Sequence, residues 1–98
     1  MSSIKELQQE ISDWVDTVNP GRTPISTISK LLEEIGELLG SERMEDELEL
    51  ADLFILALDL GTIQNIDIEG AIRKKLAINK SRTWKIADNG AMKHTNTN

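Results

Sequence analysis

The sequence predicts an all-α protein, an antiparallel four-helix bundle that assembles further through helix packing. Apolar residues recur at spacings of three and four, no segment alternates between apolar and polar residues, and both prolines lie in one short cluster. The chain has 98 residues, of which 39% are hydrophobic, so it has room for one hydrophobic core. We expect one helical domain over residues 1–85 and a mobile C-terminal extension over residues 86–98.

The first two helices are separated by a turn-forming cluster, Asn19-Pro20-Gly21-Arg22-Thr23-Pro24. Before this cluster, apolar residues at helical spacing predict a helix from about Ser3 to Val18. After it, the same spacing predicts a second helix from about Ile25 to Leu39. Thr23 or Ser26 is available as the N-cap of the second helix.

The third and fourth helices differ in polarity. Almost every residue from Leu48 to Leu60 is apolar, which predicts a central helix surrounded by protein, with Phe54 in the core. Ser41 begins a segment typical of an N-cap and would start this third helix. The fourth helix is expected to run from a cap at Asp67 to about Trp84, and it carries the basic residues.

Composition excludes several classes of function. The net charge of -6 disfavours binding of a nucleic acid polymer or an anionic membrane. Without cysteine there is no disulfide, no thiolate zinc site and no cysteine nucleophile. The longest apolar run, Leu53 to Leu58, is much shorter than the roughly 20 residues that span a bilayer. We therefore expect a cytoplasmic protein, in the host cytoplasm if the source is viral.

Two acidic motifs stand on the second and third helices, Glu33-Glu34-x-x-Glu37 and Glu49-x-x-Asp52. Residues three or four apart share one helical face, so each motif presents a pair of carboxylates. If the two helices pack antiparallel, the pairs converge. Asp52 falls in the segment expected to be buried, where a carboxylate needs compensation. Oxygen ligands suit Mg²⁺ or Mn²⁺ completed by phosphates, whereas the first motif taken alone is more typical of a solvated helix face.

A basic stripe on the fourth helix consists of Lys75, Asn79 and Arg82, at positions i, i+4 and i+7. An ammonium, an amide and a guanidinium in one row suit a triphosphate. The alternative is a solvent-facing stripe that interacts favourably with the C-terminal end of the helix dipole.

The aromatic residues and two further polar residues leave several readings open. Trp14 lies on the apolar face of the first helix, which favours core packing over stacking on a nucleotide base. Trp84 is suited to capping the core, joining an interface or shielding a pocket. His94 is expected to be a solvated tail residue, and Asp59 to support the ligands or to bond to backbone or a lysine.

Taken in order, three motifs resemble those of the all-α nucleoside triphosphate pyrophosphohydrolases, the MazG-like and dimeric dUTPase group. The motifs are Lys30-Leu31-Leu32-Glu33-Glu34-x-x-Glu37, Glu49-x-x-Asp52 and Lys75-x-x-x-Asn79-x-x-Arg82. The resemblance covers roughly Trp14 to Trp84. The stretch after Asn79 is most similar to the phage and bacterial dATP/dGTP pyrophosphohydrolases.

The resemblance implies a MazG-like bundle that cleaves a nucleoside triphosphate to the monophosphate and pyrophosphate, with a leaning toward dATP and dGTP. It implies that Mg²⁺, or alternatively Mn²⁺, is bound by Glu34, Glu37, Glu49 and Asp52. Glu33 would act in catalysis by supporting these ligands or orienting the attacking water. The implied substrate-binding residues are Lys75, Asn79 and Arg82. Trp14 is a further candidate on separate grounds, since a nucleotide base often stacks on an aromatic ring.

The small members of this group are dimers or tetramers, so the resemblance implies a homodimer or homotetramer. The helices themselves favour the same assembly, because they expose more apolar surface than a monomer of this size covers. Other nucleotide substrates, such as pyrimidine dNTPs, remain open at this point. The alternative from a different class is a non-catalytic acidic helical module that binds a partner protein, a reading that leaves a buried Asp52 unexplained.

Overall fold

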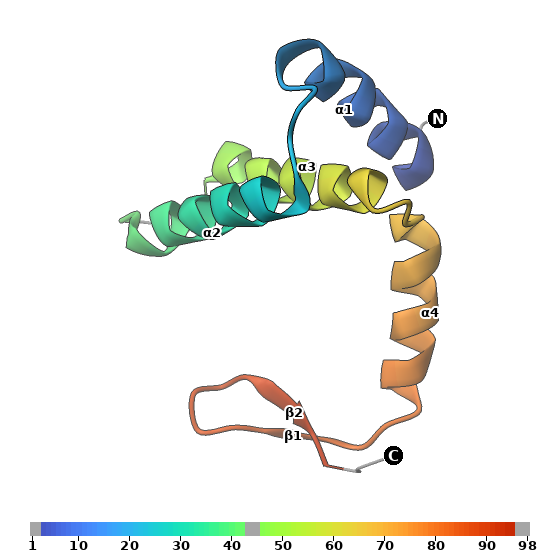
Figure 1. Cartoon of the computed structure of the whole chain (residues 1–98). Coiled ribbons are helices and arrows are strands. Elements are labelled where there is room, and N and C mark those ends of the chain that lie inside the picture. Colours follow the sequence, from blue (N-terminus) through green and yellow to red (C-terminus); the bar gives the residue numbers. More distant parts are fainter. Residues whose placement is uncertain (1–2, 43–45, 96–98) are drawn as a thin grey trace. The chain divides into compact units, whose positions relative to one another are not determined.

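Within residues 3–42 and 46–95, which the computed structural model describes, the chain forms four helices and two short strands (Figure 1). They are α1 (Ile4–Val18), α2 (Pro24–Gly40), α3 (Glu47–Ile63), α4 (Ile68–Lys80), β1 (Trp84–Ile86) and β2 (Met92–His94). The chain divides into two units, Met1–Ile68 and Glu69–Asn98. The prediction of four helices is confirmed, and the strand pair is an addition to it.

Side-chain caps fix where α1 and α2 begin. The Ser3 hydroxyl accepts the backbone N–H of Glu6 at 3.1 Å and starts α1. At α2, the Thr23 hydroxyl accepts the N–H of Ser26, and the Ser26 hydroxyl accepts the N–H of Thr23, which is a complete capping box. An N-cap of this kind stabilises a helix by about 1 kcal/mol. The predicted boundaries of both helices are confirmed, and Thr23 and Ser26 act together, not as alternatives.

The start of α3 differs from the prediction. Asp46 is the N-cap, and its Oδ1 accepts the backbone N–H groups of Leu48 and Glu49 at 2.9 and 3.2 Å. The prediction of Ser41 as the cap is wrong, because the Ser41 hydroxyl donates to the Leu38 carbonyl and closes the end of α2. Residues 43–45 of the expected cap segment lie outside the described residues.

In the first unit, α2 lies antiparallel beside α3, and α1 packs against α3 as well (Figure 1). Few side chains are fully enclosed by this arrangement. Among the described residues, the buried apolar side chains are Ile11 and Leu58. The prediction that protein surrounds α3 is wrong for the single chain, because Leu48 is 72% exposed and Phe54 is 60% exposed. Two neighbouring helices of this length, α1 and α2, cannot cover a helix that is apolar on every side.

An exposed apolar stripe runs along the whole of α2. Its members lie at alternating spacings of three and four, the heptad spacing of a coiled-coil seam, and each is exposed; they are Ile25, Ile28, Leu32, Ile35 and Leu39. We call this set the heptad stripe. Leu31 and Leu38 on the same helix are half-buried. Two apolar faces on α2 indicate a second partner besides α3.

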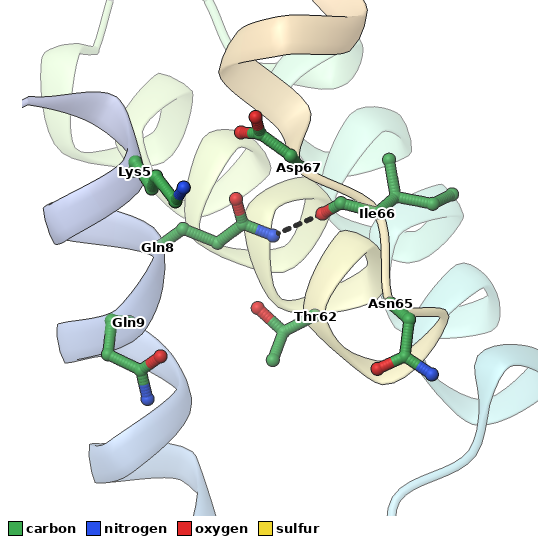
Figure 2. Close-up of a pocket in the computed structure, with 7 residues that line it drawn as sticks. All are labelled: Lys5, Gln8, Gln9, Thr62, Asn65, Ile66 and Asp67. Atoms are coloured by element: carbon green, nitrogen blue, oxygen red, sulfur yellow. Dashed lines mark hydrogen bonds between the residues drawn. The ribbon is translucent and has the colours of Figure 1, made fainter.

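A buried glutamine of α1 holds the segment between α3 and α4. The Gln8 side chain donates from Nε2 to the Ile66 carbonyl at 2.9 Å and accepts the Ile68 N–H at 3.3 Å, and Figure 2 shows the first of these bonds reaching across from α1. Asn65, just before, has a φ of 59°, in the left-handed region. The side chain therefore satisfies two backbone groups where no helix or strand does so.

In the second unit, α4 ends at Lys80, four residues before the predicted end at Trp84. The chain then forms an antiparallel hairpin in which Trp84 pairs with His94 and Ile86 with Met92. Gly90 in its turn has a φ of 88°, which favours glycine. The expectation of no strand is wrong here. The expected boundary between residues 85 and 86 falls inside β1, and a separate extension over residues 86–98 stays a prediction.

No helix among the described residues combines the length and the hydropathy that a crossing of the bilayer requires.

Candidate active site

Acidic side chains from α2 and α3 converge where the two helices lie side by side. Glu34 comes from α2, and Glu49 and Asp52 share one face of α3. One carboxylate oxygen of each lies within 4.8 Å of the others. We call these three residues the acidic cluster. The antiparallel packing of α2 and α3 brings the two sequence motifs together in this way, as the sequence leads one to expect.

Glu37, the fourth predicted ligand, lies one turn after Glu34 and outside this tightest group. Repulsion and a hydrogen bond from Glu34, followed by partial burial and the charges of Glu33 and Glu49, raise the pKa of Glu37 above its usual value. Its carboxylate is therefore within electrostatic reach of the cluster. Glu33 is exposed on α2 next to Glu34.

Glu49 has the most distinctive environment in the cluster. Its Oε2 atom is buried and, among the described residues, has no hydrogen-bond partner. Burial, followed by repulsion from Glu34, raises the pKa of Glu49. A buried carboxylate oxygen without a donor is unfavourable, and coordination to a cation relieves that cost. An all-oxygen donor set with one such atom fits a hard divalent metal ion.

Lys30, one turn before the acidic residues of α2, forms ion pairs with two of them. Its Nζ lies 3.4 Å from Glu34 and 3.4 Å from Glu33. The hydrogen bond to Glu34 is the main reason why the pKa of Lys30 is raised. One ammonium offsets only part of the charge of several carboxylates. The spacings i, i+3 and i+4 from Lys30 signal this contact in the sequence, but Lys30 was not expected at the site.

Asp52 is exposed, so the prediction that it is a buried carboxylate is wrong. The buried acid of α3 is Asp59, which is 3% exposed. Arg22 donates from Nε and Nη2 to the two carboxylate oxygens of Asp59 at 2.5 and 2.8 Å, and from Nη1 to Asp16 at 2.7 Å. The hydrogen bond to Asp59 is the main cause of a raised pKa at Arg22. The partner of Asp59 is thus an arginine, neither backbone nor lysine.

A cavity of about 390 Å³ lies between α1, α2 and α3 in this unit. Trp14, Val15, Ile55 and Leu56 form its apolar wall, while its polar lining includes the ion-paired Lys30, Arg22 and Asp59. Trp14 is 60% exposed, so the favoured reading of Trp14 as a core residue is wrong. Because Lys30 both lines the cavity and contacts Glu34, the cavity adjoins the acidic cluster.

The basic residues of the expected substrate site belong to the second unit. Asn79 and Arg82 line one cavity of about 470 Å³ together with Trp84 and Met92, whereas Lys75 is not among its lining residues. The Asn79 Oδ1 atom is buried and has no hydrogen-bond partner among the described residues. Two of the three predicted substrate-binding residues, Asn79 and Arg82, therefore line the same cavity.

The raised pKa values of Glu37 and Glu49 predict a pH-dependent response to metal. In the folded, metal-free protein these carboxylates hold protons more tightly than in the unfolded chain, so the free energy of unfolding falls as pH rises from the usual value of 4.5 through the raised pKa values. A bound divalent cation replaces those protons. The rise in melting temperature caused by Mn²⁺ should therefore be large at pH 7 and shrink toward pH 5.

Differential scanning fluorimetry across this pH range measures the effect. Glu10→Gln, a change at an exposed residue of α1, is the control and should behave like the wild type. A metal response that grows as pH falls would contradict the prediction.

The chain is similar to proteins of known activity over nearly its whole length. The family model for dATP/dGTP pyrophosphohydrolase matches residues 7–97. A dATP/dGTP diphosphohydrolase of Cyanophage S-2L is 57% identical over 93 residues, which are 95% of this chain and 89% of that protein. A dATP/dGTP diphosphohydrolase of Salmonella phage PMBT28 is 38% identical over 92 residues, and there the match spans 31% of the longer protein.

A solved structure is also similar in fold. It is a Cyanophage S-2L MazG-like pyrophosphohydrolase bound to dGDP and three catalytic Mn²⁺ ions per active site. The two chains agree with a TM-score of 0.89 and 55% sequence identity, over 98% of this chain and 100% of the other.

Proposed function

The chain belongs to the dATP/dGTP pyrophosphohydrolase family, and on that premise we propose how its own residues act on these two nucleotides. It is an all-α, MazG-like nucleotide pyrophosphohydrolase that uses divalent metal. The proposed reaction converts dATP or dGTP to the monophosphate and pyrophosphate. The proposed ligands of the metal, Mg²⁺ with Mn²⁺ as a substitute, are Glu34, Glu37, Glu49 and Asp52. The Oε2 atom of Glu49, which is buried and has no hydrogen-bond partner in the described part of the chain, carries this proposal.

The reaction needs little covalent help from the protein. When bound, the divalent cation neutralises phosphate charge and acidifies the attacking water. The water oxygen bonds to the α-phosphorus, and the bond from that phosphorus to the oxygen bridging to the β-phosphate breaks, so that pyrophosphate leaves. Glu33, exposed beside Glu34, accepts a hydrogen bond from the water and takes its proton. Positioning and charge then account for most of the catalysis.

The cavity beside the acidic cluster is the proposed site of the base. Trp14 offers an exposed ring on which a purine stacks. The polar groups deeper in this cavity, Arg22 and Asp59, already bond to one another. Lys75, Asn79 and Arg82 are proposed to bind the phosphates and the sugar, since an ammonium and a guanidinium attract phosphate oxygens and a neutral amide can bond a sugar hydroxyl or a phosphate.

A panel assay tests the proposed function. The wild-type enzyme is incubated with each of the four dNTPs and four NTPs in the presence of Mg²⁺, and in parallel Mn²⁺, and the products are separated by chromatography. We expect monophosphate and pyrophosphate, formed fastest from dATP and dGTP. Diphosphate and inorganic phosphate as products would overturn the cleavage position, and faster turnover of pyrimidine dNTPs would overturn the purine preference.

The non-catalytic acidic module is set aside, because the matched relatives are enzymes. Asp52 is exposed and does not count against this module, whereas the buried oxygen of Glu49 does. The host cytoplasm is the proposed place of action, since both matched relatives are phage proteins.

A homodimer or homotetramer is the proposed assembly, supported by the heptad stripe of α2 and by the exposed Leu48 and Phe54 of α3. Leu32→Lys places a charge in the middle of the stripe and should dissociate the assembly, because a lysine ammonium is costly to bury in an apolar seam. Light scattering should then give a mass near the 11.0 kDa of one chain. Glu10→Lys on α1 is the control and should leave the mass unchanged. A wild-type chain that is fully active as a monomer would contradict the proposal.

A further inference from the structure

We propose that Trp84 is a positioning residue that holds Asn79 and Arg82 in their substrate-binding arrangement. The inference rests on the proposed function, in which those two residues bind the nucleotide. It concerns only residues of the second unit.

The indole of Trp84 is bonded to the end of α4. Its Nε1–H donates to the Asn79 carbonyl at 2.7 Å, and the same carbonyl accepts the backbone N–H of Arg82 at 3.1 Å. The last carbonyls of a helix lack partners within the helix, so a side-chain donor there fixes the geometry of its end. A single oxygen thus connects Asn79, Arg82 and Trp84.

The hairpin in turn holds the ring of Trp84. Trp84 pairs with His94 across the two strands, and the two rings meet edge to face at 5.8 Å with an angle of 80° between their planes. Next to them, the Thr95 N–H donates to the Thr83 carbonyl at 2.8 Å. Side chains of both strands, those of Trp84 and Met92, also line the cavity that Asn79 and Arg82 share.

This arrangement holds two polar residues at the end of α4 and just beyond it. Arg82 lies in a bend after the end of α4, and its backbone N–H bonds back to the Asn79 carbonyl. Asn79 has an amide oxygen that is buried and lacks a partner among the described residues, so it is available to a donor such as a sugar hydroxyl. Fixing both residues before the nucleotide binds removes part of the entropic cost of binding. The hairpin therefore contributes to affinity through Trp84.

Trp84→Phe tests this role, because it keeps an aromatic ring on the strand and removes only the indole donor. We expect KM for dATP and dGTP to rise by about five- to tenfold, the size expected for one lost hydrogen bond. The kcat should stay within about twofold, since the donor touches neither metal nor reacting atoms. Isothermal titration calorimetry should show unchanged binding of Mn²⁺ in the absence of nucleotide.

Two further variants complete the test. Ile86→Ala, at an exposed residue of β1 that does not line the cavity, is the control and should leave KM unchanged. His94→Ala removes the ring contact that holds Trp84 but keeps the indole donor, and should raise KM by about two- to threefold. This variant serves as the test if Trp84→Phe does not fold. An unchanged KM in both substituted enzymes, or equal losses in kcat, Mn²⁺ binding and melting temperature, would overturn the inference. A wild-type enzyme that hydrolyses no nucleotide would overturn the proposed function, and the inference with it.

Discussion

A Glu49→Gln variant should turn over dATP and dGTP at least about 100-fold more slowly than the wild type, since even the loss of a group that only supports a metal ligand costs 10- to 100-fold. Glutamine has the shape of glutamate but places a neutral amide where the acidic cluster presents a buried anionic oxygen. The substitution therefore removes the charge of a proposed metal ligand and retains the packing.

Measurements of stability distinguish a loss of metal binding from unfolding of the variant. Without metal, Glu49→Gln should be at least as stable as the wild type, because it removes the partly buried charge and its repulsion from Glu34, the two main causes that raise the pKa of Glu49. With Mn²⁺, the wild type should gain stability and the variant should not.

Pyrophosphate release and thermal unfolding, each with and without Mn²⁺, measure both effects. Glu47→Gln on the exposed first turn of α3 is the matched control, and it should retain activity and metal response. Wild-type turnover by Glu49→Gln would show that the acidic cluster is not the metal site.

An Arg22→Ala variant should lower the free energy of unfolding by about 3–5 kcal/mol, which is the cost of removing one partner from a buried ion pair. The side chain of Arg22 is 7% exposed and is bonded to both oxygens of the buried Asp59. Its loss leaves a charged carboxylate enclosed by protein without a donor.

Replacing both partners gives the complementary test. Arg22→Met combined with Asp59→Leu should recover much of the lost stability, since a buried pair exchanged for apolar side chains of similar volume is often neutral. Urea unfolding at one fixed protein concentration measures the change. Arg73→Ala, at an exposed residue of α4, is the control and should shift the free energy by less than about 0.5 kcal/mol. A small loss of unfolding free energy in Arg22→Ala would mean that water reaches Asp59.

Local features were predictable from the sequence, and burial was not. The caps at Ser3 and Thr23 are local interactions, so the starts of α1 and α2 follow from the sequence. The facing pairs Glu34 with Glu49 and Asp52 follow from helical spacing and one antiparallel packing step. Helix caps and helical spacing therefore account for most of the fold and for the acidic residues of the site.

The errors have a common physical cause, which is that burial depends on neighbours distant in sequence. Asp52 and Asp59 lie on similar faces of α3, but only Asp59 meets Arg22, which is 37 residues away. The strands β1 and β2 have three residues each, too few to show an alternating pattern. Phe54 was expected in the core because its neighbours are apolar, but the single chain leaves it exposed.

The heptad stripe and Glu34 occupy different faces of the same helix, α2. Because successive helical residues are turned by about 100° around the axis, a one-residue insertion or deletion within α2 rotates everything after it away from both surroundings at once. Length changes in this helix would thus disrupt the proposed subunit contact and the proposed metal site together, so natural variants should vary by substitution there and keep the residue count constant.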